Sequence, residues 1–329
     1  MFEMPTSTRR RLAIAAAFFA ATAATTVTAA DFPTRTITLV TPFPPGSTSD
    51  LIPRLLAQVM SKSMGVSVVV ENRPGANGSV GAVKVATSPA DGYTVLLATT
   101  GVLAINQWVY PKLQYAPEKD FDPVINAAAT PNMLVVHPGI KADNLKELIA
   151  LAKATPHELS FASAGNGSTS HLCGETLKVA AGIDIVHVPY QGPAPAMQDV
   201  LSGRVGIMCD NFSNVIQHVR AGRLKAIVVT SRERSAKAGD IPTSGDAGMP
   251  DLEAGIWYGF VVPAGTPKDV VNKLNSEFAR ALQDAEVTTK LDAIGLKIIA
   301  DKPDEFRRFI GREAARMQKV VKASGAQIN

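Results

Sequence analysis

The hydrophobic residues of the chain alternate between short β-branched runs and longer stretches whose apolar positions lie three or four residues apart. The short runs predict buried strands, and the longer stretches predict amphipathic helices that cover them. This alternation is typical of an α/β protein. We expect strands over residues 37–43, 66–72, 93–99, 134–138, 159–164, 185–190, 205–210 and 224–231, and a strand and turn over residues 259–267.

Helical periods follow most of these strands. A first helix is expected to begin at about Ser49 or Asp50, because Pro53 is tolerated only in the first turn of a helix. Further helices are expected over residues 144–154, 169–181, 194–201, 268–281, 285–294 and 303–323. The sequence contains no internal repeat and no low-complexity linker.

The first thirty residues have the pattern of a secretory signal. Arg9, Arg10 and Arg11 precede an apolar stretch, and small residues lead up to Asp31. The strongly apolar part, residues 12–21, is shorter than the ~20 residues that a membrane-spanning helix needs. We therefore expect residues 1–30 to be removed near Ala30 and the mature chain to be exported. The arginines also fit a twin-arginine signal loosely, so the export route stays open.

Charge and motif content exclude several function classes. Without residues 1–30 the chain has 30 basic and 28 acidic residues, a net charge of +2, and no basic run, so no nucleic-acid partner is expected. The mature sequence lacks a P-loop, a complete GxGxxG, an HExxH, a CxxC and a GxSxG motif. The five histidines lack the spacing of metal ligands. We therefore expect no cofactor, no metal and no catalytic site.

Two glycine-rich segments each join a predicted strand to a predicted helix. We call residues 42–50, PFPPGSTSD, the first glycine loop, and residues 162–171, ASAGNGSTSH, the second glycine loop. Backbone amides at a helix start carry partial positive charge and suit a carboxylate or phosphate. Glycine, serine and asparagine also form ordinary turns and helix caps. The presence of the same design in both halves favours a ligand with two acceptor ends.

Several nearby side chains allow two interpretations. Asp50 fits a helix cap better than a ligand contact, because it would repel an anion. His171 either contacts the ligand or bonds to a neighbouring backbone group. Asp210 either caps the segment that follows it or selects an amino or hydroxyl group of the ligand. Arg73 is expected to pair or stack within its own loop, and Trp108 and Trp257 to pack within or between lobes.

Eight segments, in this order along the chain, resemble the receptors of tripartite tricarboxylate transporters, also called the Bordetella uptake gene family. They are PFPPGSTSD (42–50), VENRPGANGSVGA (70–82), PADGYTVLLAT (89–99), FDPV (121–124), ASAGNGSTSHLCGE (162–175), HVPYQGPAPAMQDVLSGRV (187–205), IPTSGDAGMP (241–250) and VVPAGTP (261–267). The resemblance covers nearly the whole mature chain. It departs from the family at Ser47, where a second glycine is common, and at Cys173 and Cys209, which are not usually cysteine.

The resemblance implies an α/β fold of the type II periplasmic binding protein class, with two lobes joined by two crossover strands and a ligand cleft between them. The first lobe would comprise residues 31–125 plus 255–329, and the second lobe residues 126–254. Ligands of open α/β sheets lie beyond the carboxyl ends of strands. The ligand-binding residues carried over from the family are Gly46, Ser47, Thr48, Asp50, Thr99, Thr100, Ser163, Ala164, Gly165, Asn166, Gly167, Ser168, His171, Pro189, Tyr190 and Asp210.

The function implied by the resemblance is that of a periplasmic solute-binding protein without enzyme activity. It would capture a small carboxylate, such as a dicarboxylate, a tricarboxylate, an aromatic carboxylate or an acidic amino acid. It would deliver this ligand, as a monomer, to the integral membrane subunits of the transporter. The alternatives are an exported serine hydrolase that uses Ser168 and His171, and a ligand-sensing subunit for a sensor kinase.

The chain has two cysteines, Cys173 and Cys209. Paired cysteines in an oxidising compartment usually form a disulfide, so we expect a bridge between them. The alternative is that both are small buried hydrophobic residues.

Overall fold

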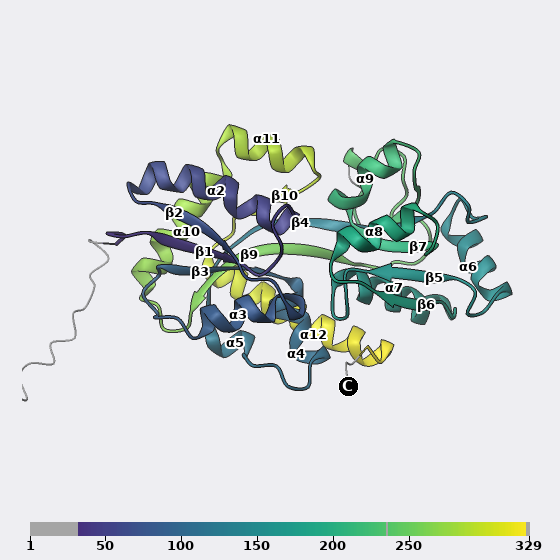
Figure 1. The fold of residues 1–329 in the computed structure, drawn as a ribbon, viewed down its shortest axis with the longest axis horizontal. Coiled ribbons are helices and arrows are strands. Elements are labelled where there is room, and N and C mark those ends of the chain that lie inside the picture. Colours follow the sequence, from purple (N-terminus) through teal and green to yellow (C-terminus); the bar gives the residue numbers. More distant parts are fainter. Residues whose placement is uncertain (1–31, 235, 327–329) are drawn as a thin grey trace, which may run out of the picture. The chain divides into compact units, whose positions relative to one another are not determined.

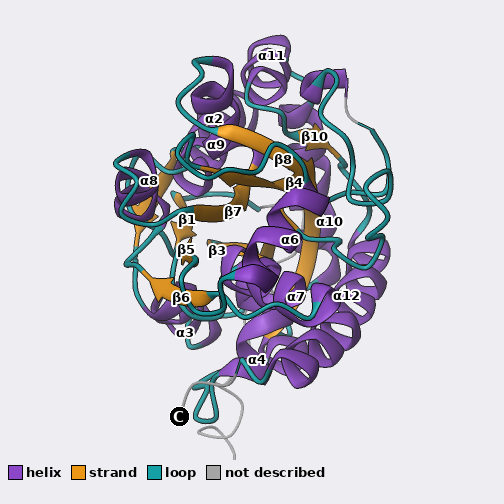
Figure 2. Ribbon diagram, turned by 90° about the vertical axis from the view of Figure 1, so that its right-hand side faces the viewer, coloured by secondary structure: helices purple, strands orange, loops and turns teal. Residues whose placement is uncertain are grey.

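The computed structural model describes residues 32–234 and 236–326. The predicted signal sequence, residues 1–30, lies outside the described residues. From Pro33 onward the chain forms one compact unit. Within the described part of the chain, no helix combines the length and the apolar character that crossing a bilayer requires. Helices lie on both sides of the strands (Figures 1 and 2).

The strands of the first sheet come from both ends of the chain. β1 is parallel to β2 and β3, and β9 runs antiparallel between β3 and β4. The helices α2 and α10 contact one another on one face, and α3 and α12 lie on the other face (Figure 1). The elements are β1 (Ile37–Thr41), α2 (Thr48–Met64), β2 (Val68–Asn72), α3 (Ser79–Ala86), β3 (Thr94–Thr99), β9 (Gly255–Pro263), α10 (Lys268–Leu282), α11 (Ala285–Ala293), β10 (Lys297–Ile298) and α12 (Pro303–Ser324).

The second sheet is built from the middle of the chain. β5 is parallel to β6 and β7, and β4 runs antiparallel between β7 and β8. One face packs against α6 and α7, and the other packs against α8 and α9. The elements are α6 (Leu145–Ala154), β5 (Ser160–Ser163), α7 (Thr169–Ala181), β6 (Val186–Pro189), α8 (Pro193–Leu201), β7 (Ile207–Asn211), α9 (Phe212–Arg220) and β8 (Lys225–Val229).

A single strand, β4 (Phe121–Val136), runs through both sheets. Its residues up to Pro131 pair with β9, and its residues from Asn132 onward pair with β7 and β8. The chain returns to the first sheet where β9 begins, at Gly255. Figure 1 shows β4 and β9 side by side along this passage.

The hydrophobic pattern predicted most of the long elements but missed several short ones, the first part of β4, and α9. A strand was expected over residues 134–138, whereas β4 already begins at Phe121. The first part of this strand contains two prolines and a run of alanines, which give no strand signal in the sequence. The pairing of β4 with β9 shifts in register next to Pro123, and prolines are tolerated at such irregularities. The helix α9 was also missing from the expectation. Its residues 212–220 follow directly on β7, with no glycine or proline to separate strand from helix.

The two glycine loops follow the carboxyl ends of β1 and β5. Between β3 and β4, a π-helical turn (Gly101–Ile105) continues into α4 (Asn106–Val109), and the short helix α5 (Pro117–Asp120) precedes β4. A 3-10 turn, η1 (Ala76–Gly78), lies between β2 and α3. Trp257 belongs to the apolar cluster that α12 covers, and the partly buried Trp108 packs against it, as expected for packing residues.

Candidate functional site

The first glycine loop ends in a capped helix start. The side chain of Ser47, the N-cap residue of α2, accepts a hydrogen bond from the backbone N–H of Asp50. Gly46 precedes it with φ +82°, a backbone conformation that side chains other than glycine rarely adopt.

Asp50 holds the first glycine loop together. Its Oδ2 accepts hydrogen bonds from the backbone N–H of Gly46 and from Arg54 Nε, both at 2.9 Å, and its Oδ1 accepts one from Asn72 Nδ2 at 2.8 Å. Burial opposes the charge of this carboxylate, but the hydrogen bonds from Arg54, Gly46 and Asn72 together lower its pKa. Arg54 also balances the negative charge that would repel an anion.

The second glycine loop repeats this construction with the same four residues, Gly-Ser-Thr-Ser. Gly167 has φ +77°, and Ser168 caps α7 by accepting a hydrogen bond from the N–H of His171. The backbone N–H of Gly167 donates to His171 Nδ1 at 3.3 Å, as that of Gly46 donates to Asp50. A neutral imidazole in the second loop therefore takes the place of the carboxylate in the first.

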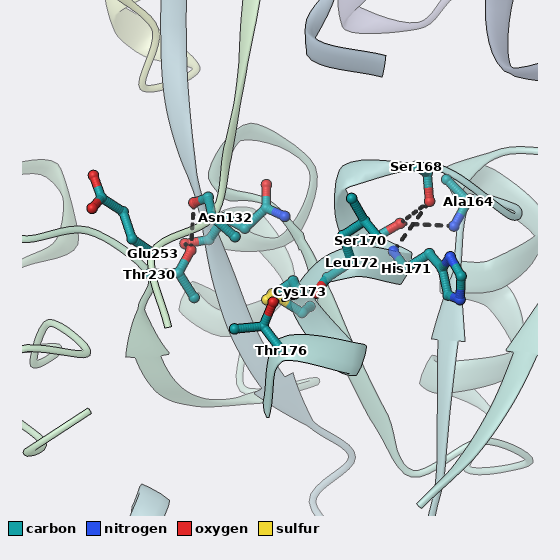
Figure 3. Close-up of a disulfide and its surroundings, with 12 residues drawn as sticks. Asn132, Ala164, Ser168, Ser170, His171, Leu172, Cys173, Thr176, Thr230 and Glu253 are labelled. Atoms are coloured by element: carbon teal, nitrogen blue, oxygen red, sulfur yellow. Dashed lines mark hydrogen bonds between the residues drawn. A yellow bond between two sulfur atoms is a disulfide. The ribbon is translucent and has the colours of Figure 1, made fainter. Parts of the chain in front are cut away.

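Each loop leaves two helix-start amides unused. In the part of the chain that the structure describes, the backbone N–H groups of Thr48 and Ser49 donate no hydrogen bond, and neither do those of Thr169 and Ser170. The other amides of the second loop are engaged internally: Ala164 donates to Ser170 Oγ, Gly165 to Ser163 Oγ, and Ser168 to the carbonyl of Gly165. Figure 3 shows the hydrogen bonds among Ala164, Ser168, Ser170 and His171. Each half therefore offers a pair of convergent donors for one acceptor group.

Two stacked histidines, His171 and His187, contact residues of the second glycine loop. The rings of His171 and His187 lie 4.1 Å apart, and His187 Nε2 lies 2.7 Å from Ser163 Oγ. Burial lowers the pKa of His171 to about 3 and that of His187 to about 4. Both rings are therefore neutral near pH 7, which leaves His171 Nδ1 able to accept the hydrogen bond from Gly167.

Asp210 lies near the carboxyl end of β7, where its charge acts on Tyr258 of β9. Asp210 is 2% exposed, and its Oδ2 accepts a hydrogen bond from Asn214 Nδ2 at 2.9 Å. Burial raises its pKa to about 6. Tyr258 of β9 is 1% exposed and lies near Thr48 of α2, and burial and the charge of Asp210 both raise the pKa of its phenol.

The remaining predicted residues have mainly structural contacts. Thr99 and Thr100 are each 1% exposed, and Thr100 Oγ1 accepts the backbone N–H of Trp257. The Tyr190 hydroxyl donates to Asp199 on α8 at 2.7 Å. Pro189 is exposed at the end of β6, and Asn166 is exposed at the tip of the second loop.

Residues outside the predicted set connect the second glycine loop to the first sheet's helices. Asn77 Nδ2 donates to the backbone carbonyl of Gly167 at 2.8 Å and to Asn106 Oδ1 at 2.9 Å. The Tyr110 hydroxyl donates to the carbonyl of Asn166 at 3.2 Å. Asn77 has φ +49°, a conformation that asparagine tolerates better than most residues. Residues 73–78 belong to a segment that resembles the family, but nothing in the sequence indicated that they contact the second loop. Arg73 itself pairs with Glu71, as expected.

The structure joins Cys173 on α7 to Cys209 on β7 in a disulfide, with the two Cα atoms 6.1 Å apart (Figure 3). Both residues are 1% exposed. The bridge fixes the first turns of α7 over the end of β7. Among residues 32–234 and 236–326, no group of three or more His, Cys, Asp or Glu side chains is placed to hold a metal ion.

Comparison with known proteins assigns the family. Residues 52–326 match the model of the tripartite tricarboxylate transporter family receptor. The chain is 37% identical over 321 residues to the protein BugT of Bordetella pertussis, covering 97% of this chain and 98% of BugT.

Two solved structures have the same two-lobe fold. Rpa4515 of R. palustris, solved with adipate, is 38% identical, with a TM-score of 0.84 over 90% of this chain and 99% of that one. The periplasmic binding protein BugD is 33% identical, with a TM-score of 0.82 over 90% of this chain and 99% of that one. The protein therefore has the two-lobe α/β fold of these binding proteins and belongs to the family of tripartite tricarboxylate transporter receptors.

Proposed function

We propose that this protein is a periplasmic receptor that binds a small carboxylate between two lobes and delivers it to the membrane subunits of a tripartite transporter. Membership of the receptor family supports this function, and so does the adipate bound to Rpa4515. The observation that carries the proposal is the pair of Gly-Ser-Thr-Ser helix starts, one on each sheet, with two unused amides in each.

The helix starts suit carboxylates because their donors are fixed before the ligand arrives. The serine caps and the hydrogen bonds from Gly46 and Gly167 hold each turn in place. The amides of Thr48 and Ser49 would take one carboxylate, and those of Thr169 and Ser170 the polar groups at the other end. The side chains of Thr48, Asp210 and Tyr258 would line the space between them.

The proposed lobes are residues 31–125 plus 255–329 and residues 126–254. The change of strand partners between Pro131 and Asn132, and the start of β9 at Gly255, support a passage between lobes close to these limits. In this arrangement the contacts from Asn77 and Tyr110 to the second glycine loop join one lobe to the other. Ligand binding would favour the form in which these contacts are made.

The geometry of Ser168 favours binding over catalysis. Its Oγ donates to the carbonyl of Gly165 at 2.6 Å and accepts the backbone N–H of His171, while His171 Nδ1 accepts from Gly167. Ser168 and His171 therefore do not form the hydrogen bond from nucleophile to base that a serine hydrolase needs. Ser163 Oγ does lie 2.7 Å from His187 Nε2, but this serine is fully buried.

A thermal-shift screen of dicarboxylates, tricarboxylates, aromatic carboxylates and acidic amino acids tests the proposal. A ligand at a hundred times its dissociation constant should stabilise the folded protein by about 2.7 kcal/mol. Gly167→Val should abolish the shift, because its added side chain would meet Asn77, Val109 and Tyr110 where the second loop contacts them. No shift with any carboxylate at millimolar concentration would contradict the proposed function.

A further inference from the structure

Two buried asparagine side chains lie side by side on neighbouring strands. Asn132 of β4 and Asn211 of β7 are cross-strand partners in the antiparallel ladder, so their side chains share one face of the second sheet. Asn132 is fully buried and Asn211 is 8% exposed. In the described part of the chain, neither the nitrogen nor the oxygen of the Asn132 amide has a hydrogen-bond partner, and Asn211 Oδ1 has none.

The disulfide fixes where these amides lie relative to the second glycine loop. Cys209 precedes Asn211 by two residues on β7, so both side chains point to the face that α7 covers. Its partner Cys173 lies one turn after Thr169 on α7. Because α7 connects the parallel strands β5 and β6, it begins at the end of the sheet where β7 ends. The first turn of α7, with the unused amides of Thr169 and Ser170, therefore lies over Asn211 and Asn132.

Neither asparagine amide has a structural role in helix capping or in packing against α7. Asn211 is the N-cap residue of α9, where an asparagine side chain usually accepts a backbone N–H, but it makes no capping hydrogen bond. On α7 nearby, Cys173 is bridged to β7, and the apolar Leu172 packs in the cluster that α12 covers, so neither offers a polar partner. Burying amide groups without partners costs free energy, so such groups point to a ligand that satisfies them.

The available donors and acceptors define the chemistry of that ligand group. Asn132 offers an NH2 group with two N–H donors and one carbonyl acceptor, and Asn211 offers a second carbonyl acceptor. A carboxylate would meet two carbonyl oxygens, and an ammonium group would meet the N–H of Asn132. A hydroxyl group fits, because it accepts one hydrogen bond and donates another.

We propose that Asn132 and Asn211 bind a hydroxyl group of the ligand next to the carboxylate end held by α7, and so select hydroxy-carboxylates over their unsubstituted parents. The inference rests on the proposed function, since it names the ligand class of that same site. The helix-start amides of α7 bind the carboxylate of the ligand, and the two asparagines hydrogen-bond to the hydroxyl group beside it.

Calorimetric titration of the disulfide-bonded mature protein with matched ligand pairs tests this selection. The pairs are succinate and malate, glutarate and 2-hydroxyglutarate, and tricarballylate and citrate, with both enantiomers where they exist. In the pair whose length fits, the hydroxylated acid should bind at least about tenfold more tightly, because a site built to hydrogen-bond a hydroxyl discriminates against an analogue that lacks it. Asn132→Leu and Asn211→Leu should each lower the affinity for the hydroxylated acid towards that for its parent, and leave the parent's affinity unchanged.

Asn275→Leu is the matched control. Asn275 is also a buried asparagine, but its Nδ2 donates to the carbonyls of Val124 and Asp301. Its replacement should lower the melting temperature of the ligand-free protein, whereas Asn132→Leu and Asn211→Leu should leave that temperature unchanged or raise it.

The outcomes separate this inference from the proposed function. Binding without a preference for the hydroxylated acid would overturn the inference alone, and so would a preference that survives in both leucine variants. A loss of stability in Asn132→Leu as large as in Asn275→Leu would also overturn it, because it would show that the amide has a structural partner. Failure of every carboxylate to bind would overturn the proposed function together with the inference.

Discussion

Replacing Asp210 by asparagine removes a carboxylate that the fold buries almost completely. The side chain is 2% exposed and accepts one side-chain hydrogen bond, from Asn214. An asparagine at this position has a similar shape and keeps an oxygen that can accept the same hydrogen bond. The difference in stability between the two proteins therefore reports mainly the cost of burying the charge.

The raised pKa of Asp210 determines how large this difference in stability is and how it depends on pH. Burial raises this pKa from 3.8 to about 6, a shift of about 2 units, and each unit corresponds to ~1.4 kcal/mol. Above pH 6 the carboxylate is charged in both the folded and the unfolded protein, so Asp210→Asn should be the more stable protein by about 3 kcal/mol. As the pH falls from 6 to 3.8, the folded wild type takes up the proton first and gains stability, so the advantage of the variant should shrink towards zero.

Urea unfolding of the ligand-free protein at pH 8 and at pH 4 measures this difference. Asp251→Asn, which replaces an exposed aspartate, is the control and should change stability little at either pH. Equal stability of Asp210→Asn and wild type at pH 8 would refute the reasoning. An advantage that stays constant between pH 8 and pH 4 would refute it as well.

Three further predictions concern export, the disulfide and the second glycine loop. N-terminal sequencing of protein recovered from the cell envelope should give a mature start within one or two residues of Ala30, and an intact Met1 would reject the signal sequence. Cys173 and Cys209 are 36 positions apart in the sequence, so losing the disulfide in Cys173→Ala should cost roughly 3–4 kcal/mol of stability. Titration of the unreduced, denatured wild type should find no free thiols. Ser168→Ala should weaken carboxylate binding by only ~1–2 kcal/mol in calorimetry, because Ser168 acts as a cap, while Gly167→Val should abolish binding without unfolding the protein.

Local signals in the sequence predicted most of the strands, both glycine loops and, to within two residues, the starts of α2 and α7. Ser47 and Ser168 are preferred capping residues before apolar helical periods, and glycine precedes each of them, so both turns were visible without a structure. The first part of β4 was hidden because its prolines and alanines lack the period of a half-exposed strand. Burial on both faces and pairing with β9, rather than local propensity, stabilise it there.

The parts of the site that the sequence did not reveal depend on contacts between distant residues. Tyr258 reaches Thr48 from more than 200 positions along the chain, and Asn77 reaches Gly167 across 90 positions. Asp50 was expected to cap the helix, but Ser47 is the N-cap of α2, and Asp50 instead accepts hydrogen bonds from Gly46 and from the distant Asn72. The pairing of Asn132 with Asn211 follows from strand register, which the hydrophobic pattern left undefined in this part of β4.

Titration of the mature protein with the carboxylate that gives the largest thermal shift, followed by recovery of the ligand, tests the central claim most directly. The account predicts saturable binding of one ligand per chain, loss of binding in Gly167→Val, and a ligand whose mass is unchanged after prolonged incubation. Binding that survives in folded Gly167→Val, or conversion of the ligand that is lost in Ser168→Ala, would contradict it.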